Sequence, residues 1–354
     1  MSRPRIAIVG AGIAGALLAL RLREQWNPPD VDLFTAWPPT HPDTGGRSVG
    51  WADASRASGG MVRAFETDPG TARLAAESLA ELRGSPELRE RVRFREHAAV
   101  YVAQPGSDLA ASLAVVDEVL PGAAEATDAD RIAREYGFHG LPRGAPGVVE
   151  RQAGHLSPDA LRAAALTDFA DLGGLVRAGP VTRVEDGPSL KLADGTAHGF
   201  DLVVVAAGAW TERLLADSGL PGGGFRTRQI QYTLCRTARD AIPSFVDEHS
   251  GLYGRPDGPG RLLLGLPTVR WDVDPDAVVP DRALAARVVA DAAQFLAAPV
   301  EAERTVASFD CFRVPPGLEL RPVAEGVVTF TGGSGGAAKT ALAASRVAGA
   351  VLAR

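Results

Sequence analysis

A glycine-rich turn near the start of the chain constrains the fold more than any other stretch of the sequence. The apolar residues 5–9 lead into Gly10, Gly12 and Gly15, and the helix-forming residues 16–22 follow. In such a unit the first glycine permits a tight turn, the second lets a pyrophosphate approach the backbone, and the third lets helix and strand pack closely. Phosphates then bind the free N–H groups of the first helical turn. The sequence therefore predicts a dinucleotide-binding α/β domain.

The end of the second expected strand, at residues 31–34, departs from the usual dinucleotide pattern. An Asp or Glu normally stands there and accepts hydrogen bonds from the adenosine ribose. The residue here is Thr35, which accepts through a single hydroxyl. No arginine follows it directly, so a 2′-phosphate cofactor is not indicated either. Thr35 weakens the expectation for the adenosine contacts and leaves that for the phosphate turn unchanged.

The composition argues against several other classes of protein. The 354 residues carry a formal net charge of −6, which disfavours nucleic acid and anionic membranes as partners. No run of about 18 apolar residues predicts a membrane span. The two cysteines, Cys235 and Cys311, fit a reducing cytoplasmic compartment better than a disulfide framework. The six histidines have no metal-ligand spacing, so no metal site is expected.

Lysine is scarce in a chain that uses arginine for almost all of its positive charge. The two lysines are Lys191 and Lys339, and the second follows the glycine-rich residues 331–338. Lysine offers a compact charge on a flexible stem, whereas arginine offers a wide planar fork. Chance suffices to explain two lysines alone, so a role for Lys339 depends on its context.

The pattern of elements predicts a nucleotide domain interrupted by strand-rich insertions. Apolar strands that end in glycine turns are expected at the start of the chain, at residues 201–208 and at residues 327–336. A long irregular loop is expected at residues 36–60, and residues 54–63 read as a backbone cradle with a cation at each end, Arg56 and Arg63. Further strands are expected at 98–102, 181–185, 189–192, 229–235 and 262–265, and helices at 69–83, 107–119, 128–135, from Ser157 towards Gly173, at 281–297 and from 337 to 352.

Taken in order along nearly the whole chain, these motifs resemble the FAD-dependent amine-oxidising enzymes that include D-amino-acid oxidase, glycine oxidase and monomeric sarcosine oxidase. The sarcosine oxidase branch is the nearest, and glycine oxidase is more distant. The motifs that carry the resemblance are the opening turn, Pro38 and Pro39, and residues 60–63, 182–186, 208–210, 253–254, 310–312 and 332–339.

The resemblance implies an α/β fold in which a Rossmann-like FAD-binding domain, of the glutathione-reductase type, is interrupted by an antiparallel-sheet substrate domain. The boundaries it implies are 1–93, 153–216 and 314–354 for the FAD-binding domain, and 94–152 and 217–313 for the substrate-binding domain.

The resemblance also implies FAD as the cofactor. Cys311 matches a cysteine that carries a thioether to the flavin in the sarcosine oxidase branch, and the alternative is a small buried apolar side chain. The residues expected to bind the cofactor are Gly10, Gly12, Ile13, Ala14, Gly15, Thr35, Ser55, Arg56, Val181, Ala207, Gly208, Trp210, Cys311, Gly333, Gly335, Gly336, Ala337 and Lys339.

Four residues are expected at the catalytic centre. Arg63 and Lys339 match an arginine and a lysine that bind the substrate carboxylate in the sarcosine oxidase branch, and two cations of different shape suit such a clamp. For Arg63 the alternative is solvated surface charge. Arg313 is a third candidate anchor for the carboxylate. Tyr253 matches a pocket tyrosine, with an ordinary core tyrosine as the alternative.

Two positions depart from the sarcosine oxidase pattern. Leu263 stands where that branch has a lysine that activates oxygen, and Pro267 stands where it has a histidine. A fixed positive charge stabilises the anion that forms as oxygen accepts an electron. Its loss predicts slow oxidase activity, a substitute cation such as Arg261 or Arg313, or an acceptor other than oxygen.

The expected function is FAD-dependent oxidation of the C–N bond of an amino acid or N-substituted amino acid to the imine, with reoxidation by oxygen giving hydrogen peroxide. The expected partners are a small amine or amino acid with a carboxylate, and oxygen or another electron acceptor. One alternative is a flavin dehydrogenase or desaturase that acts on a cyclic or biosynthetic amine with little oxidase activity. A second is a redox-inactive nucleotide-binding protein.

Overall fold

The opening strand and turn lie inside a six-stranded sheet of the computed structural model, which describes residues 3–36, 53–185 and 187–353. Its strands from β20 to β9 run parallel, and β19 pairs with β20 in the antiparallel sense. The strand order is β19 (Glu319–Ala324), β20 (Val327–Thr331), β13 (Leu202–Val205), β1 (Arg5–Val9), β2 (Asp30–Thr35) and β9 (Leu175–Ala178).

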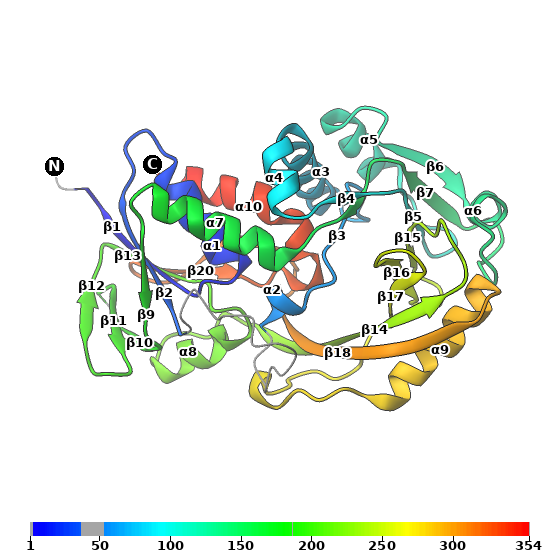
Figure 1. The fold of residues 1–354 in the computed structure, drawn as a ribbon. Coiled ribbons are helices and arrows are strands. Elements are labelled where there is room, and N and C mark those ends of the chain that lie inside the picture. Colours follow the sequence, from blue (N-terminus) through cyan, green and yellow to red (C-terminus); the bar gives the residue numbers. More distant parts are fainter. Residues whose placement is uncertain (1–2, 37–52, 186, 354) are drawn as a thin grey trace.

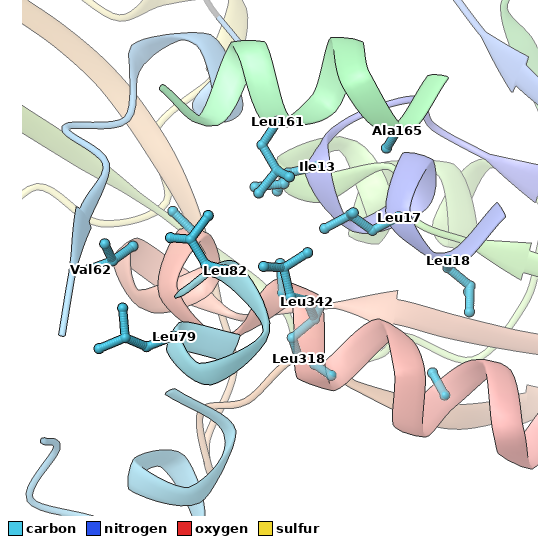
Figure 2. Close-up of a cluster of buried hydrophobic side chains, with 14 of the residues drawn as sticks. Ile13, Leu17, Leu18, Val62, Leu79, Leu82, Leu161, Ala165, Leu318 and Leu342 are labelled. Atoms are coloured by element: carbon cyan, nitrogen blue, oxygen red, sulfur yellow. The ribbon is translucent and has the colours of Figure 1, made fainter. Parts of the chain in front are cut away.

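The helices α1 (Ile13–Arg23), α7 (Pro158–Asp171) and α10 (Ala337–Leu352) cover one face of this sheet, and α3 (Pro69–Gly84) packs against α10 (Figure 1). Their leucine side chains converge in one buried cluster, in which Leu17, Leu82, Leu161 and Leu342 each come from a different helix (Figure 2). Full burial of such a side chain stabilises the fold by about 1.5–3 kcal/mol. This packing fixes where the helices α1 and α10 begin, and both begin at glycine turns.

The other face of the six-stranded sheet packs against a small antiparallel sheet and the helix α8 (Thr211–Asp217). Successive residues of a strand point to opposite faces. Ile6 and Ile8 of β1 therefore join the helix-covered core, while Ala7 and Val9 join the second one. The strands of the small sheet are β10 (Val181–Glu185), β11 (Ser189–Leu192) and β12 (Ala197–Gly199).

An eight-stranded sheet forms the other half of the molecule (Figure 1). All of its pairings are antiparallel except that of β15 with β5. The helix α9 (Arg282–Leu296) packs on it through Val288, Ala292 and Phe295. The strand order is β18 (Val300–Phe312), β14 (Arg226–Thr237), β17 (Arg261–Gly265), β16 (Tyr253–Pro256), β15 (Ser244–Asp247), β5 (Ala99–Val102), β7 (Pro146–Glu150) and β6 (Ala124–Asp128).

Short elements join the two halves of the molecule. A three-stranded sheet of β3 (Met61–Val62), β8 (Gly154–His155) and β4 (Arg95–Glu96) lies between them together with α2 (Ala54–Ala57) (Figure 1). The remaining helices are α4 (Pro86–Arg91), α5 (Ala110–Val119) and α6 (Ala129–Tyr136), with the short 3₁₀ turns η1 (Gly208–Trp210), η2 (Pro275–Ala277) and η3 (Ser334–Gly336). None of the described helices is long and apolar enough to cross a membrane.

The predicted fold class is confirmed, because a Rossmann-like parallel sheet is interrupted along the chain by a mainly antiparallel one. The expected cradle at residues 54–63 contains a helical turn, α2, and the short strand β3. Asp53 caps α2 by accepting a hydrogen bond from the backbone N–H of Arg56. Pro38 and Pro39 lie outside the described residues, and the predicted domain boundaries stay a prediction.

Candidate functional site

The turn between β1 and α1 has a backbone that side chains would not fit. Gly10 has a φ of +112°, and a Cβ there would lie 2.4 Å from the carbonyl oxygen of Ala206. A Cβ on Gly15 would lie 1.9 Å from the carbonyl oxygen of Gly10. A Cβ on Gly12 would make only an ordinary contact, 3.5 Å from Ser55 Oγ. Gly10 and Gly15 are therefore required by packing, whereas a methyl group at Gly12 would be tolerated by the surrounding protein.

The N-terminus of α1 offers N–H groups at this turn. Its N-cap is Gly12, which has no side chain to cap the helix. The N–H of Ile13 donates to Ser55 Oγ at 3.0 Å. The first N–H groups of a helix have no intrahelical partner, and the helix dipole favours negative charge there. This end of α1, which includes the predicted residues Ala14 and Gly15, therefore suits a diphosphate.

Two further glycine turns lie at the same edge of the sheet. One follows β13, where Gly208 has a φ of +55°, and the other follows β20 and leads through η3 into α10. The N-cap of α10 is Gly336, again without a side-chain cap. Because β20, β13 and β1 are neighbouring parallel strands, their carboxyl ends meet at one edge. Ligands of open α/β sheets bind at such an edge.

A cavity of about 450 Å³ lies where this edge meets the eight-stranded sheet. Its volume is in the range of cofactor and substrate sites. Leu263 and Pro267, the two departures noted in the sequence, also line it. The predicted site residues that line the cavity are Ile13, Ser55, Arg63, Tyr253, Gly335, Gly336, Ala337 and Lys339. Those that do not are Gly10, Gly12, Ala14, Gly15, Thr35, Arg56, Val181, Ala207, Gly208, Trp210, Cys311, Arg313 and Gly333.

Arg63 and Lys339 meet at the cavity through a carboxylate that the sequence analysis did not identify, Glu66. Arg63 Nη2 lies 2.8 Å from Glu66 Oε1, and Lys339 Nζ forms an ion pair with the same oxygen. Arg63 Nε donates to the carbonyl oxygen of Phe65 at 3.0 Å, and its guanidinium lies 4.9 Å from the centre of the Tyr101 ring. The predicted pair of cations is thus brought together and held in place.

Burial and charge set the protonation of this cluster. Burial favours neutral Glu66, but the charges of Arg63 and Lys339 outweigh it and lower the pKa of Glu66. Burial also lowers the pKa of Lys339, against the attraction of Glu66. Glu150, which accepts from the backbone N–H groups of Ala64 and Phe65, has its pKa raised to about 7 by burial. With Glu66 ionised and Glu150 only partly ionised near pH 7, the cluster is net positive when Lys339 is protonated.

The wall formed by the eight-stranded sheet carries charges of its own. Arg228, Arg255 and Asp310 line the cavity, and no pattern in the sequence indicated a role for any of them. Arg255 Nε donates to the carbonyl oxygen of Gly59 at 2.6 Å, and its Nη1 lies 2.9 Å from a carboxylate oxygen of Asp257. Arg255 is also the cross-strand partner of Leu263. A cation therefore lies beside the position where the sequence analysis noted a missing lysine.

The remaining predicted cavity residue is Tyr253. Its hydroxyl donates to the carbonyl oxygen of Gln231 at 3.3 Å. Burial raises the pKa of this hydroxyl, so it stays protonated at neutral pH.

Cys311 and Arg313 lie away from the cavity lining. Arg313 Nε donates to the carbonyl oxygen of Gly223 at 2.8 Å. Cys311 lies beside Thr331 and Gly332, and burial raises the pKa of its thiol to about 11. Their roles in binding stay predictions, as do those of the other predicted residues outside the cavity.

Among those other residues, Thr35 ends β2 and Trp210 ends η1. The carbonyl oxygen of Thr35 accepts from the N–H of Gly179, two residues before β10 begins at Val181. The Trp210 ring packs edge-on against Phe309 of β18, with 5.0 Å between ring centres. Arg261, the substitute cation considered from the sequence, is ion-paired with Glu303 at 2.9 Å and does not line the cavity.

The glycine turns and the cavity define a dinucleotide-binding α/β protein whose ligand site lies between two sheets. The model of the FAD dependent oxidoreductase family matches residues 5–350. The chain belongs to this family and is an FAD-dependent oxidoreductase. A search of curated proteins finds no match to the chain.

Solved structures share the fold over almost the whole chain. L-proline dehydrogenase from P. horikoshii is 13% identical with a TM-score of 0.78, over 99% of this chain and 93% of that one. Glycine oxidase from Geobacillus kaustophilus is 21% identical with a TM-score of 0.70, over 99% and 94% of the two chains. Iminodiacetate oxidase from Chelativorans sp. BNC1 is 19% identical with a TM-score of 0.70, over 99% and 95%.

The residues present fit FAD. The side-chain-free backbone at Gly12 and the uncapped N-terminus of α1 would hold its diphosphate. The uncapped start of α10, with Gly335 and Gly336 in the cavity wall, would accept the ring system close to Lys339. Large side chains at Gly335 and Gly336 would narrow the cavity that these residues line.

Proposed function

We propose that this protein oxidises the C–N bond of an amino acid or N-substituted amino acid to the imine, and that oxygen takes up the electrons and becomes hydrogen peroxide. The observation that carries the proposal is the pair of cations, Arg63 and Lys339, that lines the cavity beside the glycine turn of α10. FAD, when bound, supplies the acceptor for the hydride equivalent that leaves the substrate.

The charge of this cluster supports a carboxylate ligand. Glu66 pairs with both cations, and Arg63 and Lys339 line the cavity whereas Glu66 does not. A planar fork and a point charge can bind the two oxygens of one carboxylate from different directions. Because Glu66 and the Tyr101 ring hold Arg63 in position, little side-chain entropy is lost on binding. Arg63 and Lys339 would therefore fix the substrate, and this positioning is the protein's main contribution to the rate.

The names of the solved structures that share the fold point in the same direction. They include an L-proline dehydrogenase, a glycine oxidase and an iminodiacetate oxidase, whose names specify amino acids and a secondary amine with carboxylates. Placement in the sarcosine oxidase branch stays a prediction that rests on Arg63, Lys339 and the motifs around them.

The decisive experiment is anaerobic bleaching of the flavin by a panel of primary, secondary and cyclic amino acids. We expect at least one member to bleach the yellow holoenzyme at submillimolar concentration. Lys339→Met should raise its half-saturating concentration about tenfold to a hundredfold, as the loss of a charge-assisted hydrogen bond predicts. Lys191→Met provides the matched control, because Lys191 is the other lysine of the chain and is exposed on β11. Bleaching by no amino acid would contradict the proposal.

A dehydrogenase is the second candidate, and one observation favours it. Leu263 and Pro267 line the cavity, so that part of the wall is apolar where the resemblance led us to expect a lysine and a histidine. The yield of hydrogen peroxide per imine separates the two candidates. A yield near one supports the oxidase, whereas a yield near zero with fast reduction of an artificial dye supports the dehydrogenase.

A further inference from the structure

Asp310 is a buried carboxylate in the cavity wall that has no hydrogen-bond donor or ion-pair partner in the described part of the chain. The residue is 6% exposed, and it lines the cavity together with Phe312. Burial raises the pKa of this carboxyl, and the charge of Arg228 opposes the rise. A buried carboxylate without a partner is costly. Such a group is expected where a ligand supplies the missing partner.

The cation opposite Asp310 in the sheet, Arg228, interacts with other groups. Arg228 of β14 lies directly across from Asp310 in the pairing of β14 with β18. Its Nε donates to the carbonyl oxygen of Thr268 at 3.0 Å, and its guanidinium lies 5.0 Å from the centre of the Trp271 ring. Burial consequently prevails over Arg228 and raises the pKa of Asp310 to about 7. The carboxylate is available to a cation from outside the chain.

Asp310 and Lys339 border the same glycine turn. A Cβ on Gly335 would lie 3.1 Å from Asp310 Oδ2, and a Cβ on Gly336 would lie 3.3 Å from Lys339 Cε. The Cα atoms of adjacent residues are about 3.8 Å apart. A negative group and a positive group therefore approach neighbouring points of one turn. The ammonium and carboxylate of an amino acid, which are joined through a single carbon, have the matching arrangement of charges.

We propose that Asp310 pairs with the ammonium group of the substrate and accepts one proton from it, so that the amine is oxidised as the free base. The inference rests on the proposed function. The N–H bond of the ammonium breaks, an O–H bond forms on the Asp310 carboxylate, and nothing is oxidised or reduced in this step. The step is needed because an ammonium nitrogen has no lone pair to form the C=N bond of the imine.

This role gives the protein a characteristic pH profile. The wild-type enzyme would bind the abundant ammonium form through ionised Asp310, so its bleaching rate at low substrate rises to about pH 7 and is then level. Without the carboxylate only the scarce free amine reacts, and the rate climbs about tenfold per pH unit up to the pKa of the substrate amine. The other charged or titratable groups around the cavity are Arg63, Arg228, Tyr232, Tyr253, Arg255, Lys339 and, beside Asp310 on β18, Cys311.

The test compares Asp310→Asn with wild-type holoenzyme in anaerobic bleaching from pH 6 to pH 9. The amide has the shape of the carboxyl group, and we expect it to slow bleaching at pH 7 about 100-fold and to abolish the level region. Asp310→Glu, which keeps the carboxylate, should restore the level region. Glu301→Gln is the matched control, because it removes one negative charge from an exposed position of the same strand.

Binding measurements distinguish this role from a structural one. A carboxylate that lacks the amine should bind wild type and Asp310→Asn equally. Its binding is measured by the change that it causes in the flavin spectrum. The affinity of wild type for the amino acid should rise towards pH 7, whereas its affinity for the carboxylate without an amine should not. This comparison tests the inference without any variant. An unchanged pH profile in Asp310→Asn would overturn it while the proposed function stands, even if the visible spectrum of FAD shifted. No bleaching of wild type by any amino acid would overturn both.

Discussion

Glu66 acts on the cavity through the two cations it holds together. Its pKa is lowered because Arg63 and Lys339 outweigh the effect of burial, so it is ionised at neutral pH. Glu66→Gln leaves two like charges in contact, and removal of one member of a buried ion pair costs about 3–5 kcal/mol. We expect a loss of this size in the free energy of unfolding at pH 7, measured by urea denaturation.

The pH dependence of this loss has a defined sign. The pKa of Glu66 is lower in the folded protein than in the unfolded chain. Ionised Glu66 therefore stabilises the fold at pH values above the ordinary carboxyl pKa, and this stabilisation is lost as the pH falls through the folded-state pKa. The difference in the free energy of unfolding between wild type and Glu66→Gln should therefore become smaller at acidic pH. Glu301→Gln breaks an exposed pair with Arg236 and should cost less than about 1 kcal/mol. Equal small losses in the two variants would show that Glu66 is not needed to hold the cations.

Cys311 decides whether the cofactor is covalently attached. The thiolate is the nucleophilic form of cysteine, and burial raises the pKa of this thiol to about 11. Cys311 also lies outside the cavity lining. We expect acid precipitation to leave the yellow colour in the supernatant, both for wild type and for Cys311→Ser. Colour in the wild-type precipitate that is absent from the Cys311→Ser precipitate would establish the thioether that the resemblance suggests.

The strand β18 contains a motif that was recognised in the sequence, but the sequence did not show which of its side chains point towards the cavity. Successive residues of a strand point to opposite sides, so Asp310 and Phe312 line the cavity while Cys311 and Arg313 do not. The sequence places these four residues together, but the choice of face follows from pairing with β14, a partner some 80 residues away. Asp310 therefore received no role from the sequence, although a lone acidic residue between aromatic ones was a usable signal.

Helices were predicted more closely than strands because their signals are local. Ser157 and Pro158 mark the start of α7, and the Ser157 side chain accepts from the N–H of Ala160 at 3.2 Å. The helix α3 likewise agrees with the expected span to within one residue. The strands β6 and β15, in contrast, were not predicted. They are short and owe their conformation to pairing with β7 and β5, which local pattern does not reveal.

The turn between β1 and α1 allows a matched pair of variants that separates binding from folding. Gly12→Ala adds a methyl group that makes only an ordinary contact, 3.5 Å from Ser55 Oγ, at an ordinary φ of −69°. The fold should therefore survive while the diphosphate is displaced. Gly15→Ala places a methyl group 1.9 Å from a backbone oxygen, so α1 must shift. We expect Gly12→Ala to keep its thermal midpoint without FAD and to bind FAD at least about tenfold more weakly. Gly15→Ala should lower the midpoint itself. Wild-type FAD affinity in Gly12→Ala would contradict a diphosphate at this turn.

At the scale of the whole molecule, the glycine turns were easier to find in the sequence than the ion pairs around the cavity. The glycine turns were recognisable because each is a local strand–turn–helix pattern, and the fold then brings them to one edge of one sheet. The charged residues around the cavity come instead from distant segments, as in the ion pair of Glu66 with Lys339. Arg255 likewise meets Leu263 only through the pairing of β16 with β17. No local signal shows such pairs.

The identity of the electron acceptor depends on the charges in the cavity wall that the eight-stranded sheet forms. Arg255 is the cation beside Leu263, but the carbonyl oxygen of Gly59 and the carboxylate of Asp257 already engage it. Leu263→Lys should therefore add a positive charge that stabilises the anion formed from oxygen, and we expect at least about a tenfold faster return of the yellow colour when air is admitted to bleached enzyme. Burial and Arg255 would lower the pKa of the introduced lysine, so the gain should be largest at low pH. Leu263→Met, of similar length and without charge, is the control and should match wild type. Equal rates in all three proteins would mean that charge at this position does not limit the reaction with oxygen. A gain confined to Leu263→Lys would show that the missing charge slows the reaction of the wild-type enzyme with oxygen.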